Sequence, residues 1–137
     1  MDYEVVARYT LSVRAQDSKT GASSITTVDV LVKDINDNPP VLKSSSYYVK
    51  VEENSPPGTQ LLRVLSTDKD SGENARHFFE IERDTCLTPG SFAIDQINGT
   101  VTVTRALDYE TQKRCNIEVR VTDGGVPALH AMTSITV

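Results

Sequence analysis

The sequence predicts an all-β protein with a Greek-key, immunoglobulin-like β-sandwich fold, and three observations support this prediction. Apolar and polar residues alternate over several short segments, which is the period of a half-buried strand. Gly, Pro and Asn-Gly pairs separate these segments at the places where turns are needed. No segment has the apolar spacing of an amphipathic helix of about ten residues. Short strands at this density are typical of a two-sheet sandwich.

The alternating segments extend along the whole chain. Residues 9–15 and 26–32 alternate in the N-terminal part. In the remainder, strands are expected around residues 47–51, 62–64, 79–81, 92–94, 101–103 and 117–121. The pair Asn98-Gly99 lies between two of these strands and predicts a hairpin, because both residues tolerate positive φ angles.

The chain also repeats itself at an offset of about 106 residues. The tripeptide at residues 2–4, Asp-Tyr-Glu, recurs at residues 108–110, and the alternating apolar positions of 9–17 recur in 115–123. We therefore expect two domains in tandem. Residues 1–38 would be the C-terminal part of one repeat with its linker, and residues 39–137 a second, nearly complete repeat.

Composition limits the classes of function. The 137 residues include 19 acidic and 14 basic side chains, giving a net charge of −5. Nucleic-acid binding is not expected, since phosphates require a basic surface. No run approaches the roughly 20 apolar residues of a membrane span, and no signal-peptide pattern is present. Any such segments of the parent protein are expected outside this chain.

Acidic residues gather in the stretch between Asp34 and Glu73, among turn-forming Pro, Gly and Asn residues. An acidic run on its own is usually a solvated surface. Calcium, however, takes six to eight oxygen ligands from carboxylates, amides and backbone carbonyls. Whether these acids bind a cation therefore depends on the motifs that contain them.

Five motifs, in this order, resemble those of cadherin repeats, and together they cover essentially the whole chain. They are Asp34-Ile35-Asn36-Asp37-Asn38-Pro39-Pro40, Glu53-Asn54-Ser55-Pro56, Asp68-Lys69-Asp70 followed by Gly72 and Asn74, Leu107-Asp108-Tyr109-Glu110, and Val121-Thr122-Asp123-Gly124-Gly125. The first is similar to the linker between two cadherin repeats. Each motif is weak alone, but five in the right order are highly specific.

The resemblance implies a calcium joint between the two repeats, with up to three Ca²⁺ ions. Its ligands would be Asp2, Glu4, Ile35, Asn36, Asp37, Asn38, Asp68, Asp70, Asn74 and Asp123. Without metal, carboxylates ~4 Å apart repel by roughly 4 kcal/mol per pair at an effective dielectric constant near 20, so calcium is expected to stiffen this joint. Incomplete outer joints would use Asp17 on one side, and Glu53, Asp108 and Glu110 on the other.

The expected function is calcium-dependent cell–cell adhesion or recognition, within the ectodomain of a single-pass plasma membrane protein. The resemblance implies other cadherin ectodomains as partners, whether of the same or a different kind. Neither a nucleic acid nor a small-molecule substrate is expected, and no enzyme activity. An alternative is a non-adhesive, force-bearing spacer or a segment of a signalling receptor. A sugar-binding sandwich is disfavoured, because the chain has no Trp for an aromatic platform.

Two further features leave alternatives open. Cys86 follows one predicted strand and Cys115 begins another that would be its antiparallel neighbour, so the pair is either a disulfide or two buried thiols. Asn98-Gly99-Thr100 is an acceptor sequence for N-glycosylation, although a plain hairpin turn explains the same residues.

Two other kinds of metal site, an EF-hand loop and a zinc site, do not fit the sequence. The loop that begins at Asp68 has Glu73 and Phe79 where an EF-hand requires Gly and Glu. His77 and His130 lack a third ligand at zinc spacing, and both are predicted to be ordinary surface residues.

Overall fold

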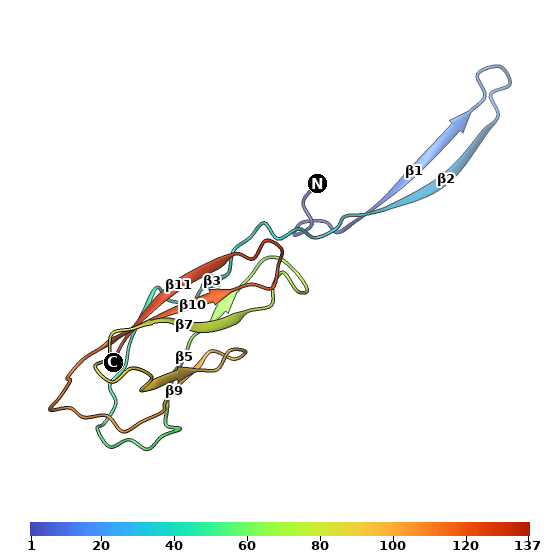
Figure 1. Cartoon of the computed structure of the whole chain (residues 1–137). Helices are drawn as coiled ribbons and strands as arrows, with labels where there is room; N and C mark the ends of the chain where they lie inside the picture. The colour runs from blue at the N-terminus through green and yellow to red at the C-terminus, as the bar shows by residue number, and fades with distance from the viewer. The chain divides into compact units, whose positions relative to one another are not determined.

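The computed structural model describes all 137 residues, and it contains strands but no helix. The chain divides into two compact units, Met1–Ile35 and Asn36–Val137 (Figure 1). The structure has no helix that is long and apolar enough to cross a membrane. The all-β prediction is therefore confirmed.

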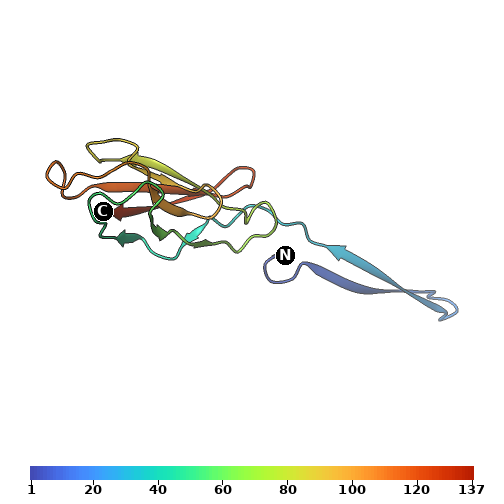
Figure 2. The same ribbon diagram turned by 90° about the horizontal axis from the view of Figure 1, so that it is seen from below.

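The first unit is built on one antiparallel hairpin, drawn in blue in Figures 1 and 2. Strand β1 (Arg8–Gln16) pairs with β2 (Ser23–Leu31), with Tyr9 opposite Val30. Both strands follow the alternation expected for residues 9–15 and 26–32. Asp17 lies at the turn between them.

The second unit has two main sheets and one short strand pair. The larger sheet has the order β4 (Ser46–Tyr48), β11 (His130–Thr136), β10 (Asn116–Thr122) and β7 (Phe78–Asp84). The second sheet has the order β5 (Gln60–Arg63), β9 (Thr100–Val103) and β8 (Phe92–Ile94). Strands β3 (Val41–Leu42) and β6 (Ser66–Thr67) form the pair. Only the β11–β4 pairing is parallel.

The core of the second unit lies between its sheets. On β10, Ile117, Val119 and Val121 alternate with polar residues, and each is 0% exposed. They pack with other buried side chains, namely Val64, Phe79, Cys86, Phe92, Val101, Val103 and Ile135. Full burial of one such side chain stabilises the fold by about 1.5–3 kcal/mol, so this cluster is the main source of stability.

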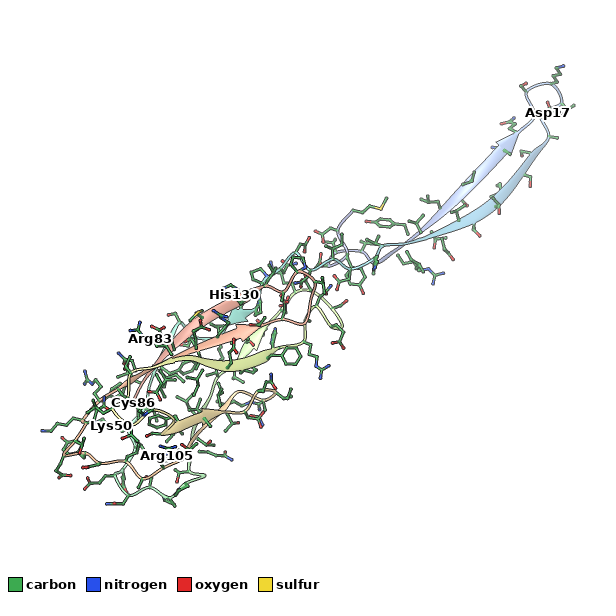
Figure 3. All side chains as sticks on the ribbon, in the orientation of Figure 1. Asp17, Lys50, Arg83, Cys86, Arg105 and His130 are labelled. Carbon is green, nitrogen blue, oxygen red and sulfur yellow. A yellow bond between two sulfur atoms is a disulfide. The ribbon has the colours of Figure 1, made fainter.

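Cys86 and Cys115 form a disulfide in the structure, which is one of the two alternatives left open for this pair by the sequence. Cys86 lies just after β7 and Cys115 just before β10, and these strands are antiparallel neighbours. The two Cα atoms are 5.0 Å apart, and the bridge closes a loop of 29 residues. A loop of this length contributes roughly 3–4 kcal/mol under the chain-entropy model. Figure 3 labels Cys86 among the side chains of this end of the unit.

One predicted strand is shorter than expected. The alternation predicts a strand over 47–51, but β4 ends at Tyr48. Its parallel partner β11 ends at Thr136, opposite Tyr48, so residues 50 and 51 have no strand beside them.

The hairpin predicted at Asn98-Gly99 connects β8 and β9, with Ile94 opposite Val101. The backbone N–H groups of Asn98 and Ile97 donate to the Asp95 carboxylate, which lowers the pKa of Asp95. Gly99 has a φ of 71°, and a Cβ atom there would lie 2.5 Å from the carbonyl oxygen of Val64. Glycine is therefore required here both for its backbone angle and for close approach.

We expect Gly99→Ala to lower the free energy of unfolding by about 2–4 kcal/mol, because strain at positive φ and the clash with Val64 add together. Gly58→Ala is the matched control. Gly58 has a φ of 92° and nothing within 4 Å of a Cβ atom, so only the backbone strain of about 1–2 kcal/mol applies. Urea unfolding of both variants measures the difference, and equal losses would contradict the steric explanation.

Candidate metal centre

Oxygen-bearing side chains from three segments of the second unit meet through hydrogen bonds. The segments are residues 36–38 at its start, the loop after β6, and the loop after β10. Each loop follows a short or fully paired strand, so the sheets fix where it begins. The result is a group of carboxylates and amides contributed by parts of the sequence more than 80 residues apart.

Asn36 and Asp123 form the most buried part of this group. The Asn36 amide donates from Nδ2 to both carboxylate oxygens of Asp123, each at 3.1 Å, and to the carbonyl oxygen of Pro127 at 2.7 Å. Asp123 is 2% exposed and also accepts backbone N–H groups of Gly125 and Leu129. The amide nitrogen thus faces the protein, while Asn36 Oδ1 is buried with no hydrogen-bond partner.

The glycine pair after Asp123 permits this arrangement. A Cβ atom at Gly125 would lie 2.1 Å from Cγ of Asn36, and one at Gly124 would lie 2.6 Å from the carbonyl oxygen of Glu73. The contact at Gly124 is with a backbone atom, and the contact at Gly125 is with a buried side chain that is held by three hydrogen bonds. The Asp-Gly-Gly sequence is therefore needed because the Asn36 side chain and the loop after β6 approach the backbone closely.

Asp70 forms the second part of the group. Asn38 donates from Nδ2 to Asp70 Oδ1 at 2.6 Å and from its backbone nitrogen to Oδ2 at 3.2 Å. The same Nδ2 donates to Asp37 Oδ1 at 2.7 Å. Asp70 is 6% exposed, whereas Asp37 is exposed. One asparagine therefore holds a buried and an exposed carboxylate near each other.

Asp68 is the third buried carboxylate, and its side chain is 0% exposed. Its Oδ1 accepts the backbone N–H of Asp70 at 3.0 Å, whereas Oδ2 has no hydrogen-bond partner. Nε2 of the His77 ring lies 3.6 Å from this Oδ2 atom. The His77 side chain is only 14% exposed, so the prediction of a surface position for His77 was wrong. His130 is exposed, as expected.

The chemistry of this group fits a hard divalent cation. The donors that surround Asp70 and Asp123 are amides and backbone N–H groups, and none of the ion pairs of the second unit brings a lysine or arginine to them. Buried carboxylates without a compensating cation are costly. Calcium prefers carboxylate and amide oxygens, and the unpartnered Asn36 Oδ1 and Asp68 Oδ2 are two such atoms.

In the first unit, two further acids lie close together. Carboxylate oxygens of Glu4 and Asp34 are within 4.8 Å of each other. Asp2 Oδ1 accepts the backbone N–H of Glu4 at 3.2 Å, which places Asp2 on the same turn. Asp34 is not among the ligands predicted from the sequence, although it lies two residues before Asn36 within the linker motif. Ile35 follows it and is exposed, while Asn74 of the second unit is half-buried in the loop after β6.

The residues assigned to outer joints are all exposed. Asp17 lies at the tip of the first unit's hairpin, where Figure 3 labels it, and the hydroxyl of Thr20 lowers the pKa of Asp17. Glu53 and Asp108 line one cavity of the second unit together with the disulfide. The hydroxyl of Thr111 lowers the pKa of Asp108, and the backbone N–H of Glu110 donates to the same carboxylate.

Asn98 is exposed, and its side-chain oxygen accepts the backbone N–H of Thr100 at 2.8 Å. This bond belongs to the β8–β9 turn. A sugar on Asn98 remains a prediction, because the turn accounts for the hydrogen bond by itself.

We expect Gly125→Ala to displace the Asn36 amide, with loss of its three hydrogen bonds and a destabilisation of about 1–3 kcal/mol. In an Asn36→Gly background the clash is absent, because glycine also lacks the Cβ atom that would lie 2.6 Å away, so the same substitution should cost much less. A double-mutant cycle by urea unfolding measures this coupling. Strictly additive losses would show that Asn36 is not the residue that requires glycine at 125.

Comparisons with known proteins show the family to which the chain belongs. A family model described as the cadherin domain matches residues 47–137. Human Protocadherin Fat 1 is 39% identical over 137 residues, covering 100% of this chain and 3% of that protein. Human Protocadherin gamma-C3 is 40% identical over 141 residues, covering 100% of this chain and 15% of that protein. The chain thus spans a small part of the length of these curated relatives.

Solved structures give the same result. Protocadherin Gamma B2 extracellular cadherin domains 3–6 match 99% of this chain and 33% of theirs, with a TM-score of 0.86 and 32% identity. The structure of mouse clustered PcdhgC3 EC1–3 matches 99% of this chain and 44% of its own, with a TM-score of 0.91 and 30% identity. Both contain several domains, which supports the tandem arrangement and the immunoglobulin-like sandwich. The chain belongs to the cadherin family.

Proposed function

We propose that this chain is a calcium-dependent adhesion or recognition module of a cadherin ectodomain. The observation that carries the proposal is the buried group of oxygen atoms at the start of the second unit. Three buried carboxylates lie there, and Asn36 Oδ1 and Asp68 Oδ2 have no hydrogen-bond partner. Membership of an adhesion family supports the same conclusion.

The metal would be held by residues of both units. From the second unit we assign Asn36, Asp37, Asn38, Asp68, Asp70, Asn74 and Asp123, and from the first Asp2, Glu4 and the carbonyl of Ile35. To these we add Asp34, whose carboxylate lies close to that of Glu4. Calcium supplies positive charge that offsets repulsion among the acids. In this proposal up to three ions fix the angle between a repeat that ends at residue 38 and one that begins at residue 39.

Partners and location follow from the family as part of the proposal. The partner would be another cadherin ectodomain, and the parent protein would be anchored in the plasma membrane with this chain outside the cell. One related structure is described as a Protocadherin gammaB7 EC3–6 cis-dimer, which supports contact between cadherin ectodomains. We assign the chain no enzymatic role. The outer-joint acids Asp17, Glu53, Asp108 and Glu110 would bind calcium in neighbouring joints.

Calcium should couple the motions of the two units. We expect ¹⁵N relaxation to show a single rotational correlation time in calcium and two shorter, different ones in chelator, because the unscreened acids then repel.

Asp70→Asn removes one buried charge and should weaken calcium binding by at least about tenfold in calorimetry. Glu118→Gln changes an acid on the sheet, away from this group, and serves as the matched control. Rotational correlation times that are the same in calcium and in chelator would contradict the proposal.

An aggregation assay separates the adhesive role from the spacer role. Beads coated with the parent ectodomain are compared with beads whose ectodomain lacks these residues, both in calcium. Loss of aggregation would support direct adhesion. Unchanged aggregation would favour the force-bearing spacer or receptor segment.

A further inference from the structure

His77 lies just before β7 in a position where a polar residue is unusual. It precedes the buried Phe79 by two residues, so the strand alternation places both side chains on the inner face. Their rings meet edge to face, with centroids 6.5 Å apart. The ring is therefore held by packing and has little freedom to turn.

Both ring nitrogens of His77 face polar atoms of the same unit. Nδ1 lies 2.7 Å from the hydroxyl of Ser66 on β6. Nε2 is buried with no hydrogen-bond partner, and it lies 3.6 Å from Asp68 Oδ2, which is also buried and without such a partner. The two atoms without hydrogen-bond partners therefore lie 3.6 Å from each other.

The hydroxyl of Ser66 selects which nitrogen carries the hydrogen. A neutral imidazole has one donor nitrogen and one acceptor nitrogen. If Ser66 donates to Nδ1, the hydrogen lies on Nε2 and points toward the Asp68 carboxylate. The opposite tautomer would direct the lone pair of Nε2 at a buried negative charge. Electrostatics therefore favours Ser66 as donor and His77 Nε2 as the group that faces Asp68.

We propose that His77 is a positioning residue for Asp68, oriented in turn by Ser66. This deepens the proposed function and rests on it, since Asp68 is one of the carboxylates assigned to calcium. An N–H dipole that lies 3.6 Å from Oδ2 and is directed at it favours one orientation of the carboxylate before the metal arrives, and it leaves Oδ2 without a hydrogen bond and available to the metal. Partners behind a ligand of this kind commonly change metal affinity by 10–100-fold when they are replaced.

Three substitutions test the proposal by calcium calorimetry on the whole chain. His77→Leu puts an apolar side chain of similar size in place of the ring and so removes the donor, and it should weaken calcium binding about tenfold. His77→Gln places an amide nitrogen near the position of Nε2 and should stay within about threefold of the wild type. Ser66→Ala removes the hydroxyl that selects the tautomer, and it should weaken calcium binding by an amount between the effects of His77→Leu and His77→Gln. His130→Leu, at the exposed histidine, is the control and should leave binding unchanged.

A spectroscopic measurement on the unaltered chain provides an independent test. Long-range ¹H–¹⁵N correlation of the His77 ring should report the Nε2–H tautomer in calcium-free solution. The Nδ1–H tautomer, or equal affinities for His77→Leu and His77→Gln, would overturn the proposal. If the wild type binds calcium normally under these outcomes, only the role of His77 fails. If the wild type does not bind calcium, the proposed function itself fails.

Discussion

The candidate site depends on buried carboxylates whose hydrogen-bond donors are neutral amide and backbone N–H groups. Asp68, Asp70 and Asp123 are held by amide and backbone N–H donors from two loops and the linker. These hydrogen bonds orient the carboxylates, but they do not neutralise them. A sandwich of this size would gain nothing from such a cluster alone, because uncompensated buried charge is destabilising. The cluster makes physical sense as a site that a divalent cation completes.

The rest of the second unit positions this group. The sheets and their apolar core fix the ends of β6 and β10, and the loops that follow these strands carry the acids. Gly124 and Gly125 let the linker and the loop after β6 approach the backbone more closely than any larger residue would allow. The disulfide and the acids at Asp108 and Glu110 lie in and around a different loop region, next to a separate cavity. Stability and the candidate site therefore come from the same arrangement of strands.

Much of this was readable in the sequence, because strand alternation and loop motifs are local signals. The alternation at residues 117–121 marked the core strand, and the motifs at residues 34–40 and 121–125 marked the acidic group. The burial of His77 was not predicted, because histidine is a polar residue. Its position two residues before Phe79, on the same face, was the signal that indicates burial. Asp34 lies inside the linker motif, but that motif alone did not predict its closeness to Glu4. The unpaired oxygen of Asn36 could not have been predicted, since it depends on hydrogen bonds between residues far apart in the chain.

The most direct test of the account is the free energy of unfolding of the chain as a function of free calcium, measured by urea denaturation. Binding to the folded state alone should raise it by about 2.7 kcal/mol once calcium reaches one hundred times its dissociation constant. Magnesium should do much less, because it requires a near-ideal octahedral site and dehydrates reluctantly. An unfolding free energy that is the same in calcium and in chelator would contradict the account, because it would show that no bound calcium compensates the charge of these buried carboxylates.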